Sequence, residues 1–261
     1  MSKKWLYAAT AVLALGAACS NVGEPPPQGG DDVTYYPNGD GSRWTYRYQR
    51  YFNNVPSGEP YDYDELFDGT VEVDGREVQR LVRGARTGDD YELFFVRDDN
   101  GHYVVTYGRE LYKGGRMVGG AYFEPAWTTL IYPLAVNRTW SEVKQEGLSP
   151  LALGLPEDLD NDGQNDLADV ESVCTVVTKE DLTIPMGTFE DCYKIRRTIY
   201  ASFHMTAGGD VDETFVQYYW FKPGKGYIQE TGDEVTVPNA SRYTFLAQLE
   251  DYDLLPARRP S

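Results

Sequence analysis

The feature that most constrains the fold of this chain is a succession of short segments in which apolar and polar residues alternate, separated by turn residues. Trp44, Tyr46 and Tyr48 alternate with polar residues, which places the three rings on one face of a strand. From Thr34 onward no stretch longer than about ten residues keeps a helical period without a Gly or Pro. Short strands at turn spacings of about 8–12 residues predict an all-β domain with one antiparallel sheet, curved into a half-barrel, a barrel or a sandwich.

Turn pairs indicate where neighbouring strands form hairpins. Asp74-Gly75 follows the strand segment 71–73, and both residue types suit a two-residue hairpin turn. A second hairpin is expected around 98–101, where the sequence reads Asp-Asp-Asn-Gly. Later strands are predicted at 170–178, 193–204, 214–221 and 243–249, so that 34–253 forms a single β domain and 254–261 a frayed tail.

Residues 1–18 are predicted to be a signal peptide. Lys3 and Lys4 precede fourteen uncharged residues, which suits an export signal and is shorter than the roughly 20 residues that span a bilayer. Residues 15–19, Leu-Gly-Ala-Ala-Cys, resemble the bacterial lipoprotein box, in which the Cys is acylated and becomes the first residue. Gly16 stands where this box usually has Leu, which leaves ordinary cleavage and an unmodified Cys19 thiol as the alternative.

Lipidation of Cys19 would make a lipid bilayer the first partner of this protein. Two or three acyl chains anchor firmly, because each buried methylene contributes about 0.8 kcal/mol. Residues 20–33 are rich in Pro and Gly and lack an apolar period, so the segment 19–33 is expected to be a lipidated Cys and a flexible tether. Ser20, which stands in place of Asp, is similar to the residue found in lipoproteins sorted to the outer membrane, and that location is expected here.

A motif of the form Tyr-Pro followed seven residues later by Trp occurs twice, at Tyr36-Pro37 with Trp44 and at Tyr132-Pro133 with Trp140. One interpretation is a duplicated aromatic binding corner. The other, which we favour, is a turn closed by Pro with a core Trp behind it, since a buried Trp contributes a large packing energy.

Four motifs in this order resemble the TapB-like β-rich domains of bacterial lipoproteins. They are the two Tyr-Pro motifs, the segment 184–192 (Ile-Pro-Met-Gly-Thr-Phe-Glu-Asp-Cys) and the segment 221–227 (Phe-Lys-Pro-Gly-Lys-Gly-Tyr). The resemblance covers residues 34–250. It implies an antiparallel β fold, a curved half-barrel similar to lipoprotein-carrier domains, and no established activity.

The segment 158–169 carries the strongest chemical signal. Oxygen-bearing side chains at loop positions 1, 3, 5 and 9, with Gly at position 6, match the spacing of calcium loops. The flanks contain Pro and Gly or read as a strand, so a structural ion is expected, with a solvated acidic loop as the alternative. The predicted Ca²⁺ ligands are Asp158, Asp160, Asp162, Gln164 through its carbonyl, Asp166 and Asp169.

Two cysteines follow Cys19. Cys174 and Cys192 lie on either side of a predicted turn, and an even pair in an exported domain favours a disulfide. The alternative is two buried thiols in neighbouring strands.

Composition and motifs exclude several function classes. The chain has 24 Lys+Arg and 41 Asp+Glu, a net charge of −17, so no nucleic-acid partner is expected. His102 and His204 are far apart, and no nucleophile elbow, phosphate loop or dinucleotide fingerprint occurs.

The sequence therefore favours a non-enzymatic binding or scaffold domain of the bacterial envelope, rigidified by calcium. Its partner would be an envelope protein or an apolar ligand such as a lipid. An envelope hydrolase and a calcium-dependent surface adhesion module are the alternatives.

Overall fold

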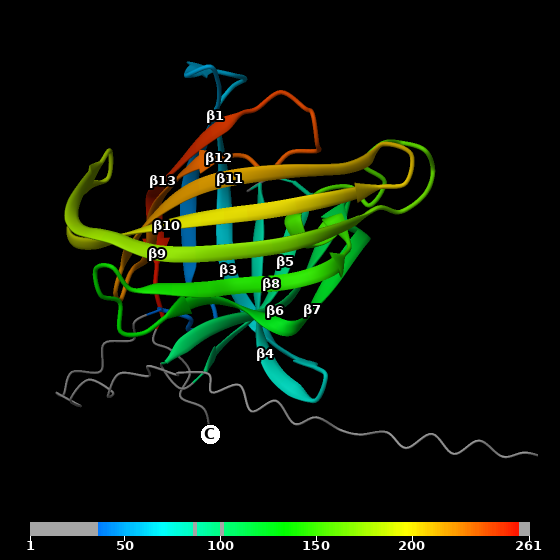
Figure 1. The fold of residues 1–261 in the computed structure, drawn as a ribbon. Helices are drawn as coiled ribbons and strands as arrows, with labels where there is room; N and C mark the ends of the chain where they lie inside the picture. The colour runs from blue at the N-terminus through cyan, green and yellow to red at the C-terminus, as the bar shows by residue number, and fades with distance from the viewer. Residues whose placement is uncertain (1–35, 86–87, 100–101, 256–261) are drawn as a thin grey trace, which may run out of the picture. The chain divides into compact units, whose positions relative to one another are not determined.

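A computed structural model describes residues 36–85, 88–99 and 102–255, and almost all of them lie in antiparallel β-strands (Figure 1). The predicted all-β fold class is confirmed. One short 3-10 helix, η1, interrupts the strands of the described part of the chain. The elements are β1 (Arg43–Phe52), β2 (Val55–Pro56), β3 (Tyr61–Val73), β4 (Arg76–Ala85), β5 (Tyr91–Asp99), β6 (Tyr103–Lys113), β7 (Arg116–Ile131), β8 (Thr139–Leu148), η1 (Pro150–Leu153), β9 (Leu167–Ile184), β10 (Gly187–Met205), β11 (Gly209–Lys222), β12 (Gly226–Asp233) and β13 (Thr244–Asp253).

The strands form one sheet that curls almost into a closed barrel. The hydrogen-bonded order is β7-β6-β5-β4-β3-β1-β13-β12-β11-β10-β9-β8, and β2 pairs only with β1. The pairing of β1 with β13 joins the N-terminal and C-terminal halves of the domain. Strands β7 and β8 stand at the two ends of this order and still pack against each other, so the sheet folds back on itself.

Side chains close the seam between β7 and β8. The indole of Trp127 donates to Gln145 Oε1 at 2.7 Å, and the indole of Trp140 donates to the Thr128 carbonyl at 3.0 Å. The amide of Gln145 donates in turn to the Glu124 carbonyl. These bonds replace a backbone ladder at the seam.

Local turn chemistry explains why the strands meet as hairpins. Asp74 and Gly75 both have positive φ, at 49° and 74°, which is the backbone of the predicted two-residue turn between β3 and β4. The second predicted hairpin joins β5 to β6, although residues 100–101 at its tip lie outside the described residues.

Both repeated Trp residues belong to the core, as the favoured interpretation predicted. Trp44 is 1% exposed, and its indole donates to the Lys225 carbonyl at 2.6 Å. Gly226, at φ +91°, lies so close that a Cβ there would approach Trp44 Nε1 to 3.0 Å. Trp140 is also buried, in the same core cluster as Tyr132.

The predicted disulfide does not form. Cys174 lies opposite Arg197 and Cys192 opposite Glu180, so six residues of β9 separate the two positions. At about 3.3 Å per residue this is roughly 20 Å, whereas disulfide Cα atoms lie within about 7 Å. Both cysteines are buried free thiols, and burial raises the pKa of each, to about 11 for Cys192.

The ends of the described chain bear on two other expectations. The segment expected to fray begins with residues that are held in place, since the Leu255 amide donates to Ser42 Oγ at 2.9 Å and Leu254 packs on the core. The signal peptide 1–18, Cys19, the tether and residues 256–261 lie outside the described residues. Within the described part, no helix has the length and apolar character needed to cross a bilayer.

Candidate functional site

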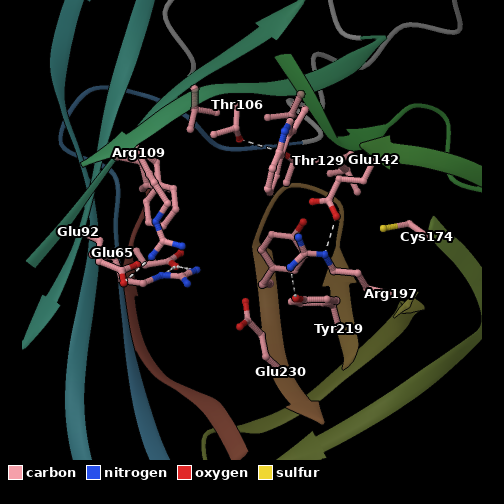
Figure 2. Close-up of a pocket in the computed structure, with 18 of the residues that line it drawn as sticks. Glu65, Glu92, Thr106, Arg109, Thr129, Glu142, Cys174, Arg197, Tyr219 and Glu230 are labelled. Atoms are coloured by element: carbon pink, nitrogen blue, oxygen red, sulfur yellow. Dashed lines mark hydrogen bonds and ion pairs between the residues drawn. The ribbon is translucent and has the colours of Figure 1, made fainter. Parts of the chain in front are cut away.

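The interior of the curled sheet holds a cavity of about 210 Å³. Its lining comes from every strand between β3 and β12 along the chain, so only the curled sheet brings these side chains together (Figure 2). The apolar and aromatic part of the lining includes Tyr36, Leu81, Phe94, Val96, Val104, Phe123, Trp127, Leu130, Ala152, Leu153, Ile195, Ile199, Tyr219, Tyr227 and Val235.

A wider cleft of about 920 Å³ connects this cavity to the surface. The cleft shares Arg83, Arg197 and Glu230 with the cavity, and it is also lined by the exposed side chains of Lys113 and Val118. The cavity and the cleft therefore adjoin at these residues.

The alternation of the strands explains why charged groups point inward. Along β3, Tyr63, Glu65 and Phe67 are buried, while Asp64 and Leu66 between them are only partly buried. Glu65 thus occupies a position that the period of two assigns to the interior.

Three arginines of the described lining each form an ion pair with a glutamate on a nearby strand. Removing such pairs from water costs several kcal/mol per ion, as a rough figure, so they are poor devices for stability alone. Their effect is to fix charged groups in set positions around the cavity. The pairs, with the shortest nitrogen–oxygen distance, are Arg83–Glu65 at 2.5 Å, Arg109–Glu92 at 2.6 Å and Arg197–Glu142 at 2.5 Å.

Arg197 has the largest network. Its Nε donates to Glu142 Oε2, and its Nη1 lies 3.3 Å from Gln217 Oε1 and 3.4 Å from the Tyr219 hydroxyl oxygen. Ser172 Oγ also donates to Glu142 Oε2, at 2.7 Å. Burial opposes the charge of Arg197, but Glu142, Tyr219 and Cys174 together more than offset it and raise the pKa of the guanidinium above its ordinary value. The Arg197 guanidinium is therefore charged at neutral pH.

Glu230 on β12 differs from the other cavity carboxylates. It is 8% exposed, it lines the cavity, and among the described residues it has no hydrogen-bond or ion-pair partner. Figure 2 shows its carboxylate in the open space between the Glu65 side and the Arg197 side of the cavity. Burial is the main cause that raises the pKa of Glu230 to about 7; Arg83 opposes the shift and the charge of Glu65 adds to it.

None of the charged residues of the cavity was predicted from the sequence. A signal existed in retrospect, because Glu65 lies between Tyr63 and Phe67, and Glu142 follows Trp140 by two. A charge at an apolar position of an alternating strand indicates an inward-facing ionisable group. Which of them meet could not be inferred without the strand order.

The predicted calcium loop is placed between η1 and β9, beside the turn from β10 to β11. Asp158, Asp160 and Asp166 each present a carboxylate oxygen within 4.8 Å of the others. Asp166 is 1% exposed and accepts from the backbone amides of Leu159 at 2.6 Å and Thr206 at 2.9 Å. Burial opposes ionisation of Asp166, but these hydrogen bonds lower its pKa below the ordinary value.

The other three predicted ligands make different contacts. Asp162 accepts from the Gln164 backbone amide and from the Thr206 hydroxyl, both at 2.8 Å. Asp169 lies in β9 and is outside the cluster, because its oxygens contact the Gly147 amide at 2.8 Å and His204 Nε2 at 3.1 Å. The structure thus brings together Asp158, Asp160 and Asp166, which are loop positions 1, 3 and 9. Asp169, at position 12, lies apart from them.

Comparison with known proteins finds similarity in structure alone. No family model and no curated protein matches the chain. A protein of Bacteroides fragilis described as exported, with a YmcC-like fold, is 13% identical over 85% of this chain and 99% of its own, with a TM-score of 0.32. A protein of Parabacteroides distasonis described as a lipoprotein is 14% identical over 86% and 100%, with a TM-score of 0.34. These values carry no information on function, and membership of the TapB-like family stays a prediction.

Proposed function

We propose that this protein is a binding domain of the bacterial envelope whose interior cavity takes a small amphiphilic molecule. The observation that carries this proposal is the cavity itself. Protein interiors are packed as densely as organic crystals and leave few voids larger than a water molecule. Here about 210 Å³ stays open at the centre of the sheet and joins a surface cleft.

The lining indicates the chemistry of the ligand. Leu81, Val96, Leu130 and Ile195 offer an apolar surface, and the fixed ion pairs and Glu230 offer charge. Sites with mostly apolar walls and few placed polar groups are typical of small-molecule binding. The apolar ligand such as a lipid that the sequence favours would therefore carry a polar end as well as an apolar body.

Binding is better supported than hydrolysis. The carboxylates of Glu65, Glu92 and Glu142 are each held by an arginine, so among the described lining residues Glu230 has no second unpaired carboxylate to complete an acid-base pair. Neither His102 nor His204 lines the cavity. We therefore keep the non-enzymatic role as the proposal.

The envelope location rests on the sequence. The charge pattern of residues 1–18 and the small residues before Cys19 support export and acylation, with an outer-membrane anchor as the finer proposal. In this proposal Cys19→Ser leaves the precursor uncleaved or releases the protein from the membrane. A Cys19→Ser protein that stays processed and membrane-bound would contradict the anchor.

Native mass spectrometry tests the binding role. The protein is extracted from its membrane without denaturant, and a bound molecule is expected as a reproducible mass increment that is lost on unfolding. Ala152 lines the cavity, so Ala152→Phe should fill it and remove the increment, while Ala240→Phe on an exposed loop should not. A wild-type protein that carries no increment and binds no amphiphile would refute the role.

We also propose that calcium binds the loop 158–169 as a structural ion. The residues fit a hard cation in part, since three carboxylates converge and each oxygen is a ligand type that calcium prefers. The ion would neutralise Asp158, Asp160 and Asp166 and fix the loop against the Thr206 turn. Thermal unfolding with millimolar calcium and with chelator measures this directly.

A further inference from the structure

The charges that line the cavity do not balance. Each of the three arginines in the described lining is matched by one glutamate at 2.5–2.6 Å. Glu230 is a fourth glutamate and has no counterpart among the described residues. When it is ionised, the ion-paired interior therefore carries one surplus negative charge.

The position of Glu230 excludes a hidden structural partner among the described residues. Its backbone lies between Tyr219 of β11 and Ala247 of β13, and neither side chain bonds to it. Arg83 and Arg197 are the positive charges that act on Glu230, but each is already paired with a glutamate, Arg83 with Glu65 through Nε and Nη2 and Arg197 with Glu142 through Nε. Figure 2 draws no interaction that reaches the Glu230 carboxylate, which projects into the open space.

An unpaired carboxylate in such a place favours a cation over an anion. A buried charge without a partner is costly, and an incoming positive group offsets that cost with a charge-assisted hydrogen bond. An anion would instead meet the carboxylates that already occupy the arginines. The rings of Tyr219 and Tyr227, which line the same cavity, also favour a cation.

We infer that Glu230 recognises the ammonium group of an aliphatic amine, whose carbon chain lies along the apolar wall of the cavity. The wall is formed by Leu81, Phe94, Val96, Val104, Leu130 and Ile195. This inference rests on the proposed function and names the class of ligand that the cavity takes.

Matched eight-carbon probes with different head groups test the assignment. Octylammonium, octanol and octanoate share one chain, so isothermal titration calorimetry at pH 8 compares the head groups alone. Wild-type protein should bind octylammonium about tenfold or more tightly than octanol, and octanoate most weakly, as expected for a charge-assisted bond. Glu230→Gln should remove this preference while the affinity for octanol stays within about threefold. Glu190→Gln, on an exposed part of β10, is the matched control and should behave as wild type.

A second measurement uses the unmodified protein and so does not depend on the folding of a variant. Glu65, Arg83, Arg197 and the Tyr219 and Tyr227 rings face Glu230. Burial raises the pKa of Glu230 to about 7, so Glu230 is expected to take up a proton between pH 8 and pH 6. Octylammonium affinity should therefore fall several-fold over this range, and octanol affinity should not.

The outcomes separate this inference from the proposed function. Equal affinity for the three probes, a preference for octanoate, or a preference for octylammonium that persists in Glu230→Gln would overturn the ammonium assignment and leave the cavity as a binding site. Absence of binding by all three probes would overturn both.

Discussion

Replacing Glu230 by Gln should stabilise the protein at alkaline pH and change its stability little at acidic pH. The carboxyl group of Glu230 is buried, which raises its pKa from 4.5 to about 7 in the folded protein. The folded state therefore holds this proton more tightly than the unfolded state does. The stabilisation that this proton provides is fully present below about pH 4.5 and is lost as the pH rises through about 7.

The magnitude follows from the two pKa values. One pKa unit corresponds to about 1.4 kcal/mol, so the wild-type protein loses about 3 kcal/mol through Glu230 between acidic pH and pH 8. Gln fits the same space and does not titrate. The free energy of unfolding of Glu230→Gln should then exceed that of the wild type by about 3 kcal/mol at pH 8 and by less than about 1 kcal/mol at pH 5. For a domain of this size the alkaline difference is about 6–12 °C in Tm.

Urea unfolding at pH 5 and pH 8, followed by circular dichroism, measures the effect. The difference between variant and wild type removes the contribution of the other titrating groups, which the two proteins share. Glu190→Gln should show no pH-dependent difference. A Glu230→Gln protein that is equally stabilised, or equally destabilised, at both pH values would refute the assignment of a raised pKa to Glu230.

Three further predictions concern the ion, the fixed charges and the thiols. Saturating calcium at about 100 times its Kd should stabilise the protein by about 2.7 kcal/mol, and Asp160→Ala should abolish the shift; a Tm that is indifferent to calcium and chelator would count against the site. Arg197→Ala should lower the free energy of unfolding in urea by about 3–5 kcal/mol, because it leaves the Glu142 carboxylate buried without its cation. A smaller loss at neutral pH would mean that water solvates this ion pair. Thiol titration under denaturing conditions without reductant should find both Cys174 and Cys192 reactive, and reductant should leave the Tm unchanged; a protected pair would contradict the register of β9 and β10.

The strands and turns were predictable from sequence because their causes are local. Trp44 and Tyr46 show the period of two, and Asp74-Gly75 supplies the backbone that the turn needs. The pairing of β1 with β13 was not predictable, because it depends on residues about 200 positions apart and on a sheet that must close.

The same limit explains the errors in the predicted sites. Cys174 and Cys192 lie in paired strands as expected, but the register between the strands, set over many residues and two irregularities, keeps them apart. Asp169 has the right spacing for a calcium loop, yet strand β9 begins before it and turns it toward His204. In the sequence, Glu230 cannot be told apart from the other acidic residues, which number 41 with it. Only the fold shows that it is buried and that no described residue pairs with it.

A crystal structure of the protein with octylammonium tests the central claim most directly, because it asks whether the interior holds a ligand and where its charged end lies. The expected result is density for the chain along Leu130 and Ile195, with the nitrogen at about 2.7–2.9 Å from a Glu230 carboxylate oxygen. An empty or collapsed cavity at saturating ligand would contradict the binding role, and a nitrogen pointing out through the cleft would contradict recognition by Glu230.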